Sequence, residues 1–186
     1  MTDGARTRRP PRTEAQLVEI VRRYLVGEGY RVYVDPDGTD YFDVVARRDG
    51  EVGLVEVKVA GPHAVLAQAL RRRAWGDWCA VALGSARSAE RLAAYTLGRR
   101  AAPIGIWSVG PDSVRVHRAA LPWSSVGSDT PFVETRARFR RWLEEVDALA
   151  PDASVHFSGV VGEVRRASGG RTFGEWRLDE GIDPPT

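Results

Sequence analysis

The sequence predicts an α/β domain with a mixed central β-sheet flanked by helices. Residues 40–58 are predicted to form two strands joined by Asp49-Gly50, a pair favoured in hairpin turns because glycine tolerates positive φ. Residues 78–83 are a continuous apolar run, typical of a central strand covered on both faces. With helical segments around them, these strands give the order αβββαβαββ.

The first helix is predicted over residues 13–27, because Thr13 and Gln16 form a capping-box pattern ahead of an apolar stripe. At about 100° per residue, Glu14 falls on the side of that stripe and Glu19 on the solvent side. Glu14 therefore either reaches toward a site on the sheet or complements the helix dipole.

Gly, Pro and Ser residues mark the boundaries of the remaining predicted elements of the main domain. They are a strand at 30–34, a helix that starts at Gly61-Pro62, a third helix at 88–102 capped by Ser88, and a closing hairpin of 104–109 and 113–117. On the edge strand of this hairpin we expect His117 to point outward, with nothing nearby to orient it.

Length and composition describe either one domain or one domain with an appendage. The chain has 186 residues, of which 43% are hydrophobic and 28% charged, a composition typical of an ordinary soluble protein. No apolar run approaches the length of a membrane span, and we see no signal peptide, so a cytoplasmic location is expected. The single cysteine, Cys79, excludes an internal disulfide and is expected to be buried.

Four segments are predicted along the chain. They are a basic arm at 1–12, the main domain at 13–118, a linker at 119–131, and an extension at 132–186 made of a helix, a hairpin (154–166 and 171–178) and an acidic tail. The arm either neutralises phosphates or is a solvated terminus. The extension is too small to be stable alone, so we expect it to pack on the main domain or on a second subunit.

The hairpin carries the residues that point to chemistry. Period-2 alternation places Glu56 and Lys58 on one face of their strand, and Asp43 lies on the preceding strand. Two acids and a lysine in apolar strands are unfavourable if they are buried unpaired. A divalent cation between Asp43 and Glu56 would offset that penalty, and hard oxygen ligands suit Mg²⁺ or Mn²⁺. The alternative is an edge hairpin whose polar face meets water.

Lys58 is the only lysine among 27 lysine and arginine residues. Arginine supplies charge anywhere on a surface, whereas lysine is compact and its pKa responds to its surroundings. A lone lysine two residues after a strand carboxylate therefore favours a chemical role for this side chain over a polar face that simply meets water.

Asp43, twelve intervening residues and then Glu56-Val57-Lys58 resemble the PD-(D/E)xK phosphodiesterase superfamily, the restriction-endonuclease-like fold. The spacing is most similar to that of archaeal Holliday-junction resolvases, and Phe42 replaces the usual proline. The resemblance covers about residues 13–118 and implies a metal-dependent endonuclease that acts on DNA.

The resemblance also implies roles for individual residues. The Mg²⁺ ligands, with Mn²⁺ as a substitute, would be Asp43, Glu56, the Val57 carbonyl and Glu14, directly or through water. Lys58 would position the attacking water and offset the charge of the transition state, and Gln68 would orient the water or the phosphate. The products would carry 5′-phosphate and 3′-hydroxyl ends.

Helical phase places Gln68, Arg71, Arg72 and Trp75 on the outer side of the second helix. The arginines and the tryptophan would hold a phosphate backbone and stack a base, or else form a solvated arginine face beside a packed tryptophan.

The alternative functions are a non-catalytic nuclease-like module for nucleic-acid binding or assembly, and a scaffold for acidic proteins. A homodimer is compatible with cutting both strands, which commonly needs two sites.

Overall fold

The structure is a computed structural model that describes residues 13–34, 42–97, 103–126, 132–149 and 155–156. The predicted arm, residues 98–102 of the predicted third helix and all but two residues of the predicted C-terminal hairpin lie outside these ranges.

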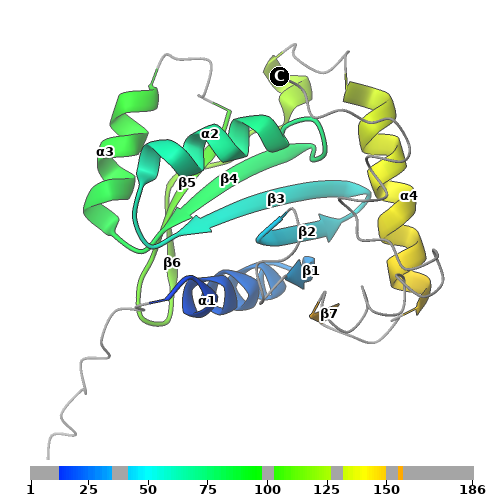
Figure 1. Cartoon of the computed structure of the whole chain (residues 1–186), viewed down its shortest axis with the longest axis horizontal. Helices are drawn as coiled ribbons and strands as arrows, with labels where there is room; N and C mark the ends of the chain where they lie inside the picture. The colour runs from blue at the N-terminus through cyan, green and yellow to red at the C-terminus, as the bar shows by residue number, and fades with distance from the viewer. Residues whose placement is uncertain (1–12, 35–41, 98–102, 127–131, 150–154, 157–186) are drawn as a thin grey trace, which may run out of the picture.

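The core of the fold is a seven-stranded sheet in the order β6-β5-β4-β3-β2-β1-β7 (Figure 1). The pairs β3–β4 and β4–β5 are parallel, and the two-residue β7 pairs parallel to β1. The pairs β1–β2, β2–β3 and β5–β6 are antiparallel. The strands are β1 (Arg31–Val34), β2 (Val44–Arg48), β3 (Glu51–Lys58), β4 (Trp78–Leu83), β5 (Gly105–Val109), β6 (Val114–Arg118) and β7 (Val155–His156). The prediction of a mixed sheet flanked by helices is confirmed.

Helices cover both faces of this sheet (Figure 1). The apolar side of α1 (Glu14–Gly27) packs in one hydrophobic cluster with Val44, Val55 and Val57. The opposite face, which carries Val45 and Leu54, packs against α2 (Pro62–Arg72), α3 (Ala86–Thr96) and α4 (Val133–Leu149). A short 3-10 helix, η1 (Trp123–Val126), adds Trp123 to this second cluster. No helix within the described ranges is long and apolar enough to cross a membrane.

Local sequence signals explain where α1 begins and where the β2–β3 hairpin turns. Thr13 accepts a hydrogen bond from the Gln16 N–H while the Gln16 side chain accepts one from the Thr13 N–H, so the predicted capping box is present. Asp49 and Gly50 have φ of 51° and 82°, the two positive values that a type I′ turn needs. This turn sets the register of the hairpin.

The third helix begins earlier than the sequence pattern predicts. Ser85, not Ser88, is the N-cap, and its side chain accepts a hydrogen bond from the Ser88 N–H. Both serines are suitable caps, and β4 ends at Leu83, so the helix can start as soon as the chain leaves the sheet. It ends at Thr96, because Leu97 has an extended ψ of 128°.

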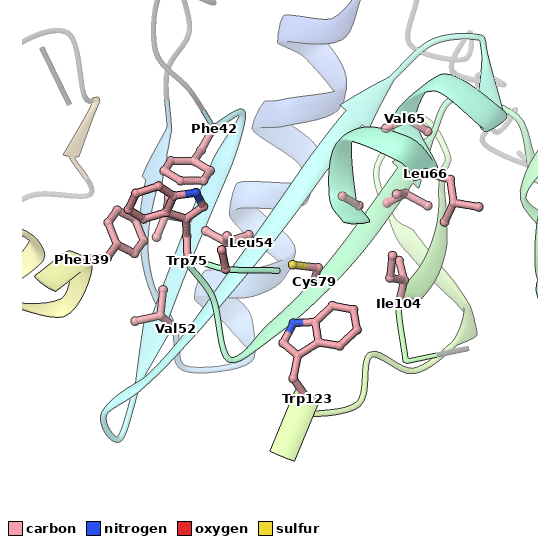
Figure 2. Packing of buried hydrophobic residues seen from close by; sticks show 14 of the residues in the cluster. Phe42, Val52, Leu54, Val65, Leu66, Trp75, Cys79, Ile104, Trp123 and Phe139 are labelled. Carbon is pink, nitrogen blue, oxygen red and sulfur yellow. The ribbon is translucent and has the colours of Figure 1, made fainter. Parts of the chain in front are cut away.

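The predicted placement of Trp75 on the outer side of the second helix is wrong. The indole is fully buried and packs beside Phe42 and Phe139, with ring centroids 6.2 Å apart in the Trp75–Phe139 pair (Figure 2). The helix ends at Arg72, so the chain has turned before Trp75 and helical phase no longer applies. Trp75 is therefore a core residue that cannot stack on a base in this structure.

The C-terminal helix belongs to the same core. Four apolar residues of α4 are buried in the cluster that contains Trp75, namely Phe139, Trp142, Leu143 and Val146. Asp147 adds polar contacts, since it pairs with Arg31 and with Arg47 at 2.7 and 2.8 Å. The helix thus packs on the main domain.

His117 is oriented, contrary to expectation. Its Nε2 lies 2.8 Å from the hydroxyl oxygen of Ser108, which is buried on β5. The pairing of β5 with β6 shifts between Ile106 and Trp107, leaving His117 as an extra residue. A bulge of this kind redirects a side chain in a way that strict alternation does not predict.

Candidate active site

The two acids of the hairpin lie opposite each other. In the β2–β3 register Val44 pairs with Val55, so the next position on each strand is Asp43 and Glu56. Both share the sheet face of Val45 and Leu54, because side chains alternate along each strand. Glu56 is 3% exposed and Asp43 is partly buried, so each carboxylate is largely removed from water.

Burial and the negative charge of a neighbouring carboxylate raise the pKa of both carboxyl groups. Burial raises the pKa of Glu56 to about 7, and the negative charge of Asp43 adds to the rise. Burial also raises the pKa of Asp43, although the Val57 N–H and the charge of Lys58 oppose it. The two acids and Lys58 therefore lie close enough to act on one another.

Asp43 is held at the point where the β2–β3 ladder stops. Its Oδ2 accepts a hydrogen bond of 2.7 Å from the Val57 N–H. The carbonyl of the next residue, Lys58, accepts from the Gly84 N–H on the β4 side. Because backbone groups of successive strand residues point to opposite sides, the Val57 carbonyl faces the β2 side, as Asp43 does.

Lys58 contacts the first residue of α1. Its Nζ lies 2.9 Å from Oε2 of Glu14, and the side chains are 27% and 48% exposed. Burial alone would lower the pKa of Lys58, but the hydrogen bond to Glu14 and the charge of Asp43 outweigh it, so the pKa is raised. Lys58 is therefore an ammonium at neutral pH, and its contact places Glu14 at the same end of the sheet.

Arg72 is the residue of this site whose role the sequence did not indicate. Its Nε lies 3.1 Å from Oε1 of Glu56, and the side chains are only 13% and 4% exposed. The guanidinium also lies 5.5 Å from the ring centroid of Phe42. The predicted outward orientation is therefore wrong. The signal was present, since Val65, Ala69 and Arg72 are spaced i, i+4, i+7, which is one inward stripe.

Gln68 and Arg71 lie in different environments. Gln68 is one turn before Arg72, so the two share a side of α2. Its Oε1 is buried and has no hydrogen-bond partner among the described residues. Arg71 is exposed. The predicted phosphate-binding set of Arg71, Arg72 and Trp75 is thus divided among solvent, the Glu56 ion pair and the core.

The oxygen atoms available to a cation come mainly from two carboxylates. Within the five described ranges of the chain, no group of three or more His, Cys, Asp or Glu side chains is arranged to hold a metal. In the same part of the chain, Oδ1 of Asp43 and Oε2 of Glu56 have no hydrogen-bond partner, although the Glu56 carboxylate is ion-paired with Arg72 through Oε1. These two oxygens, with the Val57 carbonyl on the same side, form a donor set of the hard type that Mg²⁺ prefers. The residues fit a divalent cation, with Glu14 engaged by Lys58.

No protein-family model and no curated protein sequence matches the chain. A solved structure of a protein of unknown function from Silicibacter pomeroyi is similar at 18% sequence identity and a TM-score of 0.43. The match covers 76% of this chain and 95% of that one. Similarity at this level indicates neither a family nor a function.

Proposed function

We propose that this protein is a metal-dependent endonuclease that hydrolyses phosphodiester bonds in DNA. The observation that carries the proposal is the arrangement at the end of β3. Two buried carboxylates lie opposite each other, and the only lysine of the chain lies beside them. This is the residue set through which positions 43–58 resemble the PD-(D/E)xK superfamily. A cytoplasmic location stays a prediction.

Each residue has a role that its surroundings support. Asp43, Glu56 and the Val57 carbonyl would hold Mg²⁺, or Mn²⁺ in its place. The ion, when bound, lowers the pKa of water and neutralises charge on the phosphate. Lys58 would orient the attacking water and offset the negative charge that develops in the transition state. Gln68, whose buried carbonyl oxygen has no partner in the described part of the chain, would orient the water or the phosphate.

One observation favours the non-catalytic alternative. Glu56 is paired with Arg72 and Glu14 with Lys58, so both acids have a cationic partner without any metal. A nuclease-like module that binds nucleic acid without cutting it would retain such pairs as structural contacts. Metal binding therefore separates the two functions.

The test is a cleavage panel of labelled single-stranded, duplex, flap and junction DNA, with RNA counterparts, in Mg²⁺, Mn²⁺ or EDTA. We expect Lys58→Ala to lower the cleavage rate at least about 100-fold with substrate binding kept. Asp43→Ala should abolish cleavage and Mn²⁺ binding together, as measured by calorimetric titration. Arg141→Ala, an exposed change on α4, is the control and should cut at the wild-type rate. Wild-type cleavage by the Lys58 and Asp43 variants would refute the assignment.

A further inference from the structure

A groove lies between the N-terminal end of α2 and one face of α3. Its volume is about 330 Å³, and it is lined by Pro62, His63, Ser88, Arg91, Leu92 and Tyr95. Pro62 and Leu92 are apolar, two residues are aromatic rings, and Arg91 supplies a positive charge. Pockets with apolar walls and a few polar groups are the usual form of ligand sites.

The groove and the candidate active site share one edge of the molecule. The helix α2 starts four residues after Lys58, and four residues span at most about 14 Å. The helix α3 follows β4 directly, beyond Gly84, whose N–H donates to the Lys58 carbonyl. Both helices cover the sheet face that carries Asp43 and Glu56, and their ends meet the end of β3 at the left of Figure 1.

The positive charge beside this groove is uncompensated. Arg87 and Arg91 lie one turn apart on α3, both are exposed, and neither has an ion-pair partner among the residues that the structure describes. Like charges at this spacing repel each other. Glu90, the only acid of this helix, instead pairs with Arg115 on β6. The arrangement is suited to an anion rather than to helix stability.

An aromatic wall accompanies the charge. Tyr95 is 49% exposed, and its ring meets the ring of His63 edge to face at a centroid distance of 5.3 Å. A large half-exposed ring supported by a second ring offers a flat apolar surface to a planar ligand. Bases stack on such rings when their faces are not already covered by neighbouring base pairs.

We infer that this groove binds an unpaired nucleotide of single-stranded DNA next to the bond that is cut. Arg91 and Arg87 contact the phosphate, and the base lies against Tyr95. The inference rests on the proposed function for the position of the cut, and it adds the substrate class. A fully paired duplex hides its base faces, so the groove selects a strand with unpaired nucleotides.

The experiment measures binding of the full chain in EDTA, where no metal-dependent cleavage takes place. Fluorescence anisotropy is recorded with fluorescein-labelled oligothymidylate and with a duplex of the same length. We expect tighter binding of the single strand. Tyr95→Ala should weaken that binding about tenfold, the loss of one stacked base, and Tyr95→Phe should retain it.

The arginines are tested by salt dependence. The Arg87→Gln, Arg91→Gln double variant should reduce the slope of log Kd against log salt by about 0.7, because the two arginines neutralise one phosphate and each phosphate neutralised on a single strand contributes about 0.7. Arg141→Gln, an exposed arginine on α4, is the matched control and should leave the slope unchanged. Urea unfolding confirms that each variant is folded.

Three results would overturn the inference: equal affinity for single strand and duplex, unchanged binding by the Tyr95→Ala and double arginine variants, or an equal loss in the Arg141→Gln control. Cleavage with Mn²⁺ separates this failure from that of the proposed function. A wild-type chain that cuts DNA while the groove variants bind normally refutes the groove alone. A wild-type chain that never cuts, with binding lost in the groove variants, refutes the nuclease and supports the groove.

Discussion

Glu56→Gln is expected to stabilise the protein, and by an amount that depends on pH. Glutamine has the size of glutamate and its carbonyl oxygen can still accept the hydrogen bond from Arg72 Nε, but it cannot ionise. The substitution therefore removes the charge from a site that is 3% exposed while retaining its packing.

The magnitude follows from the raised pKa of Glu56. Burial and the charge of Asp43 raise that pKa from 4.5 to about 7, and each pKa unit corresponds to about 1.4 kcal/mol, so the total is about 3 kcal/mol. Between pH 4.5 and 7 the folded chain keeps a proton that the unfolded chain has released. The wild-type stability contributed by this group is therefore full below pH 4.5, falls as the pH rises, and is lost above pH 7.

The assay is urea unfolding of both proteins at pH 4.5, 6 and 8 in EDTA. The free energy of unfolding of Glu56→Gln minus that of the wild type should rise with pH by about 3 kcal/mol. Glu145→Gln, at an exposed position on α4, should give a difference that does not change with pH. A Glu56→Gln difference that is constant, or that falls toward pH 8, would refute the reasoning. A bound cation would offset the cost of burying the ionised Glu56 carboxylate. Added Mn²⁺ should therefore stabilise the wild type at pH 8 but not the Glu56→Gln variant.

Other expected outcomes follow from the same packing. Arg72→Ala should lower the free energy of unfolding by about 3–5 kcal/mol at pH 8, because it leaves the buried carboxylate of Glu56 without its cationic partner. The loss should be smaller at pH 5, where Glu56 is protonated, and urea unfolding at the two pH values checks this. Gly53→Ala should destabilise by about 1–3 kcal/mol or more and change tryptophan fluorescence, because a Cβ there would lie 1.9 Å from the Trp78 ring. The control is Gly27→Ala, because a Cβ added at Gly27 would have no neighbouring atom within 4 Å. This variant should be as stable as the wild type or slightly more stable. Burial raises the pKa of Cys79 to about 12, so a thiol reagent should label it only after unfolding.

Local patterns were sufficient for most of the fold. The capping box at Thr13, the Asp49-Gly50 turn and the apolar run at 78–83 each depend on residues close in sequence, so their prediction needed no knowledge of neighbours. Their order then limited the possible topologies to a mixed sheet with helices on both sides. The two-residue turn leaves one register, and that register places Asp43 opposite Glu56.

Predictions failed where a residue's direction depended on more than its local period. Trp75 comes after α2 has ended, His117 occupies a bulge, and Ser85 competed with an equally suitable cap at Ser88. In these cases the end of an element, a bulge or a competing cap overrode the pattern. Arg72 is different, because its inward direction fits the stripe of Val65 and Ala69, and Glu56, sixteen residues earlier in the chain, supplies the opposite charge that it meets there.

The amino-acid order alone determined which acids and which lysine could meet, since strand alternation and a tight turn are short-range constraints. Only the tertiary structure decided how those charges are balanced: Arg72 on Glu56, Glu14 on Lys58, and a backbone N–H on Asp43. The reason is physical. A buried charge is tolerated only beside a partner, and which partner is within reach depends on how helices pack across the sheet.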